Sequence, residues 1–158
     1  MNKYELTNVT RTFDDGTVVH RIRAVRDIEL SDGTKVRADD IGGWVESESN
    51  LSQDGSAWVG DEAMACYSAR VYGDAVVRES ALVSGRAQAY GKARIYGSAV
   101  VYGDAEVCGD AEVCGKARVY GDAVVRGSAR VYGNARVYDD AVVTGFARVG
   151  GDERASVA

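Results

Sequence analysis

Small and branched apolar residues return along most of the chain with a fixed period of six. Ala occupies sixteen consecutive positions that lie six residues apart, from Ala57 to Ala147. Val or Ile follows two residues later in fourteen of these hexads, and Gly comes two residues after that in twelve. The repeating unit therefore reads Ala-x-Val-x-Gly-x. A period of six gives no helical stripe, and Gly and Val at this frequency oppose a helix.

This unit predicts a short strand followed by a corner. Residues two apart on a strand point to the same side, so Ala and Val of each hexad face inward together. Gly takes a positive φ without steric cost, which suits the corner. Three hexads, or eighteen residues, would close one triangular coil filled by Ala and Val. Each coil would then pair its strands in parallel with the next, and about five coils would stack into a rod.

The repeat resembles the hexapeptide-repeat superfamily over residues 57–152. The motif of that family is a small residue, any residue and an aliphatic residue, with Gly close behind; it is present here as Ala75-Val76-Val77, Ala93-Arg94-Ile95 and Ala117-Arg118-Val119. One departure concerns the corner, because Gly stands one residue later than is usual in the family. The resemblance implies an all-β, left-handed parallel β-helix. The left-handed sense is implied by the resemblance alone, since it opposes the general preference for right-handed crossovers.

The first fifty residues differ in kind from the repeat. Alternating or β-rich stretches are separated there by Asp-Asp-Gly and Ser-Asp-Gly turn signals. We expect residues 1–50 to form a small β cap and junction, residues 51–152 to form the β-helix, and residues 153–158 to be a C-terminal tail. A cap is needed because a solenoid end exposes apolar interior and unpaired strand edges. The stretch that begins Gly42-Gly43-Trp44 also resembles the opening of short hexapeptide-repeat proteins of phage and prophage genomes.

A coil of eighteen residues predicts which outward side chains lie above one another. We call the three sides of the triangle the first, second and third faces. Their outward residues are Met64, Leu82, Val100, Arg118 and Arg136 on the first face; Trp58, Val76, Arg94, Glu112, Arg130 and Arg148 on the second; and Arg70, Gln88, Glu106, Val124 and Val142 on the third. The corner after the first face carries Tyr102, Tyr120 and Tyr138, a tyrosine ladder beside Arg118 and Arg136.

Two of these groups are candidate interaction surfaces. Tyr and Arg are enriched in interface hot spots, so Tyr102, Tyr120, Tyr138, Arg118 and Arg136 form a candidate binding surface. The tyrosines also have a purely structural interpretation, in which they cover and stiffen the corner. The outward apolar residues indicate that something covers them, either the N-terminal segment or another subunit; they are Trp58, Met64, Val76, Leu82, Val100, Val124 and Val142. The family resemblance implies a homo-oligomer, with a trimer as the first expectation.

Composition narrows the classes of function. The formal net charge is −5, which argues against general nucleic-acid binding. No run of eighteen apolar residues and no signal peptide is present, so we expect no membrane span and a cytoplasmic location, the host cytoplasm if a phage encodes the chain. Three Cys residues, an odd number, fit reduced thiols.

Catalytic and metal chemistry finds little support in the residues. Most named members of the superfamily transfer acyl groups with a His as general base, whereas the single His here, His20, lies in the N-terminal segment. One His cannot form the three-His zinc site of other relatives, and Cys108 and Cys114 fall on different corners. We therefore expect no catalytic residues, no metal and no cofactor.

Three hypotheses follow. The first is a non-enzymatic solenoid that binds a protein or has a structural role; its sharper form is a phage protein that binds and inhibits a host protein. The second is an unusual acyltransferase that works in a cleft between subunits. The third is a nucleotide or nucleic-acid binder that uses the Tyr and Arg side chains.

Overall fold

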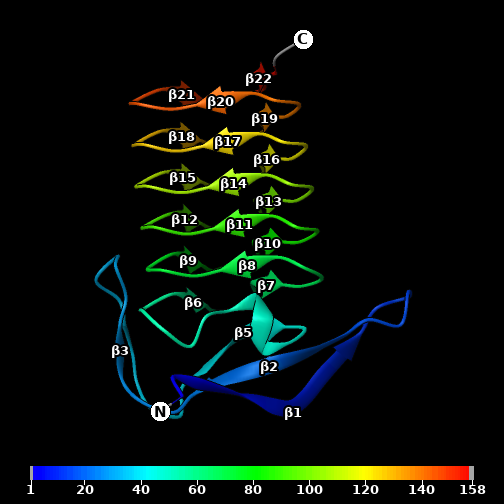
Figure 1. Ribbon diagram of the computed structural model, residues 1–158, viewed down its shortest axis with the longest axis vertical. Coiled ribbons are helices and arrows are strands. Elements are labelled where there is room, and N and C mark those ends of the chain that lie inside the picture. The colour runs from blue at the N-terminus through cyan, green and yellow to red at the C-terminus, as the bar shows by residue number, and fades with distance from the viewer. Residues whose placement is uncertain (1, 157–158) are drawn as a thin grey trace.

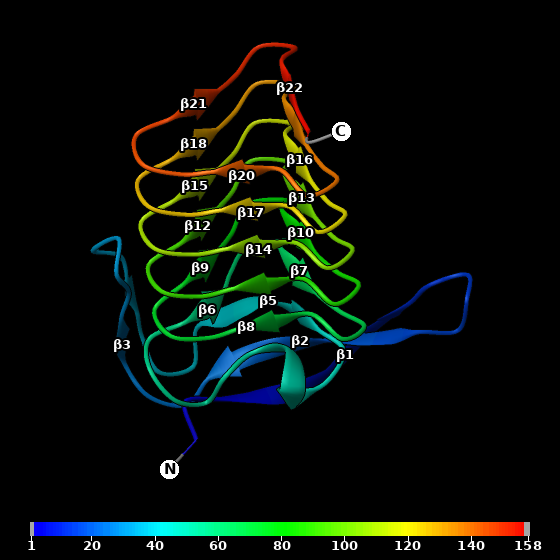
Figure 2. The same cartoon turned by 45° about the horizontal axis from the view of Figure 1, so that its top comes forward.

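The computed structural model describes residues 2–156 and is built almost entirely of short strands. The repeat forms a stack of parallel coils with three faces, as Figures 1 and 2 show. An all-β solenoid with a β cap is therefore confirmed. It has about six coils instead of five, because its first strand pairs begin before Ala57. The left-handed sense stays a prediction from the family resemblance.

Each face is a ladder of two-residue strands. The first face holds β7 (Met64–Ala65), β10 (Leu82–Val83), β13 (Val100–Val101), β16 (Arg118–Val119), β19 (Arg136–Val137) and β22 (Arg154–Ala155). The second holds β6 (Trp58–Val59), β9 (Val76–Val77), β12 (Arg94–Ile95), β15 (Glu112–Val113), β18 (Arg130–Val131) and β21 (Arg148–Val149). The third holds β8 (Arg70–Val71), β11 (Gln88–Ala89), β14 (Glu106–Val107), β17 (Val124–Val125) and β20 (Val142–Val143).

The register follows the period of eighteen. Leu82 pairs with Val100, and Val100 pairs with Arg118. Ala and the aliphatic residue of each regular hexad are buried, from Ala57 and Val59 to Ala141 and Val143. Backbone N–H groups of one coil donate to carbonyls of the next, as Val76 does to Ala93 over 2.9 Å. The solenoid is thus stabilised by one apolar column and three hydrogen-bonded ladders.

The corners explain both the Gly and its exceptions. Gly97 has a φ of +68°, and a Cβ on it would lie 2.8 Å from the N of Gly115 in the next coil. Coil stacking therefore needs Gly for its backbone angle and for its missing side chain. Four hexads have another residue at this position and keep the positive φ: Asp61, Tyr67, Glu79 and Asp139.

The N-terminal segment closes the lower end of the coil. Here β1 (Tyr4–Thr12) pairs antiparallel with β2 (Val18–Ala24), and β2 pairs antiparallel with β5 (Ile41–Val45). Strand β5 also pairs in parallel with β7, so cap and first face form one continuous nine-stranded sheet. The β1–β2 hairpin extends beyond the coil as an arm (Figure 1).

The first coil is longer than the others. Trp44 pairs with Met64, twenty residues later instead of eighteen. The short 3-10 helix η1 (Glu48–Asn50) lies at its first corner, and Asn50 is buried. The Asn50 amide donates to the carbonyls of Tyr67 and Ala69, and its oxygen accepts from the N–H groups of Glu46 and Ser47. Asn50 thus fulfils all its hydrogen-bonding capacity at an irregular corner.

A second hairpin lies against the second face. Strands β3 (Ile28–Glu29) and β4 (Lys35–Val36) pair antiparallel and lie beside β6 and β9 in Figure 1. The turn is attached by Ser31, which donates to the carbonyl of Asp74 over 2.8 Å, and by an ion pair of 3.0 Å between Arg78 and Asp32. Burial opposes the charge of Asp32, but hydrogen bonds from Thr34 and the Arg78 guanidinium outweigh it, so the pKa of Asp32 is lowered.

Candidate functional site

The tyrosine ladder is a stack of nearly parallel rings. The ring centroids of Tyr102 and Tyr120 lie 4.9 Å apart with an interplanar angle of 7°, and those of Tyr120 and Tyr138 lie 5.4 Å apart at 9°. All three side chains are half-buried. The corner position and the coil spacing therefore hold each ring against the next. The ring faces that meet in the stack are thus covered by neighbouring rings.

A second tyrosine stack has a different hydrogen-bonding pattern. Tyr72 and Tyr90, at the corner after the third face, stack at 5.0 Å. The Tyr72 hydroxyl donates to Gln88 over 2.8 Å, and the Tyr90 hydroxyl to Glu106 over 3.3 Å. Tyr96, which follows the second face, donates in the same way to Glu112. Each acceptor stands sixteen residues after its tyrosine, on the next coil of the same face.

The same offset gives the ladder of Tyr102, Tyr120 and Tyr138 no acceptor. The residues sixteen positions later are Arg118, Arg136 and Arg154, and an arginine side chain has donors only. Among the hydrogen bonds within residues 2–156, none is made by these three hydroxyls. The hydroxyls of this ladder are therefore available to a partner, unlike those of Tyr72, Tyr90 and Tyr96.

The structure brings the predicted arginines together in one column and adds a third. Arg118 pairs in register with Arg136, and Arg136 with Arg154. Arg118 and Arg154 are exposed and Arg136 is half-buried. Sequence analysis placed Arg154 in the tail, although its spacing of eighteen from Arg136 carries the signal. We call Arg118, Arg136 and Arg154 the arginine column.

On the second face, by contrast, two arginines have a carboxylate partner. Glu112 lies between Arg94 and Arg130, with ion-pair distances of 4.0 Å and 2.9 Å. Within the described residues no carboxylate forms such an ion pair with the arginine column. The first face therefore carries uncompensated positive charge on a chain that is acidic as a whole.

The outward apolar residues of the first coils are covered by the N-terminal segment. Trp58 and Val76 are buried and share a hydrophobic cluster with Ile28, Leu30 and Val36 of the β3–β4 hairpin. Met64 and Leu82 are partly buried against a cluster that Phe13 of the arm also contacts.

The remaining outward apolar residues lie higher on the coil. Val100 and Val124 are half-buried, and Val142 is 51% exposed. Phe146, at a corner of the last coil, is 87% exposed.

Side chains with catalytic potential occupy structural positions. Nδ1 of His20 lies 3.2 Å from the carbonyl oxygen of Thr7. Burial raises the pKa of the Cys66 thiol to about 11, which disfavours the reactive thiolate. Cys108 and Cys114 are free thiols on different corners. Within residues 2–156 no group of three or more His, Cys, Asp or Glu side chains is arranged to hold a metal ion.

One cleft lies between the β3–β4 hairpin and the coil. Its volume is about 300 Å³, and Leu30, Trp58, Val76, Asp61 and Arg78 are among its lining residues. It contains neither His nor Cys. Over the residues that the structure describes, no helix has the length and apolar character needed to cross a membrane.

Comparisons with known proteins concern the repeat. Residues 87–103, 117–133 and 129–145 match the family model described as the YdcK beta solenoid repeat. A curated relative, the uncharacterized acetyltransferase YdcK of Escherichia coli (strain K12), is 33% identical over 89 residues, which cover 54% of this chain and 25% of that protein. The aligned part thus corresponds to about a quarter of the length of that relative. Both similarities fit a β-helix family of the hexapeptide-repeat type.

Proposed function

We propose that this protein is a non-enzymatic solenoid that binds another protein through the tyrosine ladder and the arginine column. The observation that carries the proposal is the contrast among the tyrosines. Tyr72, Tyr90 and Tyr96 use their hydroxyls within the chain, whereas Tyr102, Tyr120 and Tyr138 do not. Pre-stacked rings lose little side-chain entropy on binding, and Tyr and Arg are the residues that most often dominate interfaces.

The finer form of this proposal concerns the biological setting. The sequence around Trp44 resembles that of short phage and prophage proteins. This resemblance supports a small phage-encoded protein that acts in the host cytoplasm by binding and inhibiting a host protein. The regular faces of the coil support protein contact, since solenoids bind partners over extended surfaces.

Capture of a partner tests this function. The tagged protein is expressed in its bacterial host, and co-purifying proteins are identified by mass spectrometry. We expect a stoichiometric partner that is lost when Tyr102, Tyr120 and Tyr138 are all replaced by Ala. The matched control replaces Tyr72 and Tyr90 by Ala and should retain the partner. A ladder variant that stays folded by circular dichroism and keeps its partner would refute the choice of surface.

Self-association is part of the same proposal, with a homotrimer expected first. Val124 and Val142 form an apolar strip on the third face, and Val142 is half exposed. Light scattering of the purified protein measures the mass. We expect an oligomer that dissociates when Val142 is replaced by Asp, because the substitution would bury a charge in the contact. A monomer of the unsubstituted protein would exclude this part of the proposal.

An acyltransferase is the second candidate, and the name of the E. coli relative, an uncharacterized acetyltransferase, favours it. Such an enzyme would bind an acyl-CoA in a cleft between subunits, with His20 or a carboxylate as the base. Calorimetric titration with acetyl-CoA tests it. Saturable binding that is abolished in a His20→Ala variant would favour the enzyme, and absence of binding would favour the solenoid that only binds protein.

A further inference from the structure

The arginine column is a row of like charges at strand spacing. Arg118, Arg136 and Arg154 pair in register on adjacent strands β16, β19 and β22, which lie above one another in Figure 1. Paired parallel strands lie about 4.8 Å apart. Like charges directly opposite one another on neighbouring strands destabilise a sheet. A row of three such charges therefore favours a ligand that brings negative charge to this face.

The flanking residues define what kind of anion fits. The corner that carries Tyr102, Tyr120 and Tyr138 continues into Asp104, Asp122 and Asp140, all exposed. Asp104 already pairs with Arg86 at 2.9 Å, so Asp122 and Asp140 are the carboxylates that repel anions spreading over the corner; they lie beyond the tyrosine ladder from the arginine column. Only a narrow anionic segment lying along the first face meets the arginines and avoids the aspartates.

The stacked rings argue against bases as the ligand. Sequence-tolerant binding of single-stranded nucleic acid depends on base stacking against aromatic faces. Here the faces of Tyr102, Tyr120 and Tyr138 are largely occupied by one another, at centroid distances of 4.9 and 5.4 Å. What they offer to a partner is hydroxyl groups, which together with guanidinium groups are good donors to carboxylates.

We infer that the first face binds an extended, carboxylate-rich protein segment, whose acidic side chains pair with Arg118, Arg136 and Arg154 and accept hydrogen bonds from the tyrosine ladder. This inference rests on the proposed function and specifies the chemistry of its partner. Nucleic acid is the competing ligand. A peptide is favoured over nucleic acid because the aspartates at the corner repel a broad polyanion and because the tyrosine rings stack on one another instead of being free to stack on bases.

Fluorescence anisotropy with defined probes tests the inference. The probes are a short labelled peptide that alternates Glu and Ser, its Gln and Ser analogue, and a single-stranded oligonucleotide of equal charge. We expect the Glu peptide to bind more tightly than the other two, and its binding to weaken as salt is raised. Replacing Arg118, Arg136 and Arg154 by Gln should weaken binding at least about tenfold, as expected for the loss of several charge pairs.

A second triple variant provides a control of equal net charge. Arg94, Arg130 and Arg148 of the second face are replaced by Gln, which should change the affinity of the Glu peptide less than about twofold, since these arginines lie on another face and two of them already pair with Glu112. Equal loss in both variants would mean that only net charge matters and would overturn the inference. Tighter binding of the oligonucleotide, equal binding of the Gln peptide, or no binding of any probe would overturn it as well.

Failure of the acidic-peptide inference and failure of the proposed function give different results. If a co-purified partner still depends on Tyr102, Tyr120 and Tyr138 but binds independently of salt and of the arginine column, the protein-binding function stands and the acidic partner is wrong. If no partner depends on the tyrosine ladder, the proposed function itself fails.

Discussion

The capped end and the regular coils satisfy their backbone hydrogen-bonding groups in different ways. In the regular coils, backbone N–H groups of the strands and corners donate to carbonyls of a similar neighbouring coil, and the interior is Ala, Val and Ile. At the capped end there is no preceding coil, and polar side chains act as partners instead. Lys3 and Asn50 are the buried polar or charged side chains of residues 2–156, and both lie at this end.

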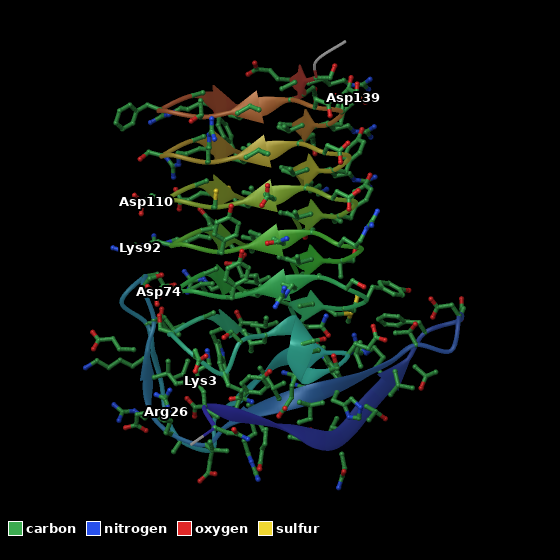
Figure 3. The ribbon with its side chains drawn as sticks, viewed as in Figure 1. Lys3, Arg26, Asp74, Lys92, Asp110 and Asp139 are labelled. Atoms are coloured by element: carbon green, nitrogen blue, oxygen red, sulfur yellow. The ribbon has the colours of Figure 1, made fainter. Side chains whose placement is uncertain are left out.

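Lys3 shows how this end is closed. Its ammonium lies between the cap strands and the first coil (Figure 3) and donates to the carbonyls of Ala57, Asp54 and Gly55. Tyr4, beside it, donates to the carbonyl of Leu51 over 2.5 Å. The regular coils are thus stabilised by many equivalent contacts, whereas the capped end is stabilised by a few hydrogen bonds that occur only there. Single substitutions should therefore cost more at the cap.

Asn50 should give the largest effect. Replacement by Leu leaves the N–H groups of Glu46 and Ser47 and the carbonyls of Tyr67 and Ala69 without their partners. We expect a loss of about 4 kcal/mol in the free energy of unfolding, measured by urea denaturation. The control is Asn134→Leu on an exposed corner, which should change it by less than about 0.5 kcal/mol. Similar losses in both variants would contradict the distinction between cap and coils.

Lys3 should make stability depend on pH. Burial, assisted by Arg26, lowers the pKa of Lys3 from 10.5 to about 8, and Asp54 and Asp74 oppose the shift only partly. Between pH 8 and 10.5 the unfolded chain retains this proton and the folded chain has lost it. The contribution of Lys3 to stability therefore rises with pH through this window, by up to about 3 kcal/mol.

The measurement compares the unfolding free energies of the wild type and the variants below pH 10. Other titratable groups contribute equally to the pH dependence of each protein, so their contribution cancels in the difference. Burial raises the pKa of Cys66 from 9.0 and that of Tyr4 from 10.0, so each reduces stability once the pH rises above that starting value, in the wild type and in the variants alike. The stability of the wild type relative to Lys3→Met should rise from pH 7 to pH 9.5, and Lys92→Met, at an exposed lysine, is the matched control. A constant difference for Lys3→Met would show that Lys3 keeps its ordinary pKa.

The same comparison explains what the sequence could predict. The period of eighteen follows from interior packing, so it predicted the strand register and the stacking of Tyr102, Tyr120 and Tyr138. The availability of their hydroxyls was also within reach, because it depends on the residue sixteen positions later. Nothing periodic surrounds Lys3 or Asn50. Their burial depends on tertiary contacts that a lone polar residue does not reveal. A cover over Trp58 was one expectation from the sequence, but its form as the β3–β4 hairpin was not.

A regular corner can be broken by one methyl group. At Gly109, with a φ of +66°, a Cβ would lie 2.9 Å from the N of Gly127 in the next coil. We expect Gly109→Ala to cost about 2 kcal/mol, from the left-handed backbone and the steric conflict together. Gly145 has a φ of +67° with no atom within 4 Å of such a Cβ, so Gly145→Ala isolates the backbone cost, about 1 kcal/mol. Equal losses by urea denaturation would mean that close stacking of corners adds nothing.

The partly exposed ladder of Arg94, Glu112 and Arg130 should give the smallest effect, because solvent reaches both arginines and screens the charges. Glu112→Gln removes both ion pairs and should cost about 0.5 kcal/mol at low salt and less at high salt. Glu106 accepts from Tyr90 but forms no ion pair within the described residues, so Glu106→Gln should show no such dependence on salt. If both variants respond to salt alike, the ladder is not a local ion-pair network. A response confined to Glu112→Gln would show that Glu112 neutralises Arg94 and Arg130 locally, whereas no carboxylate of the described residues pairs with the arginine column.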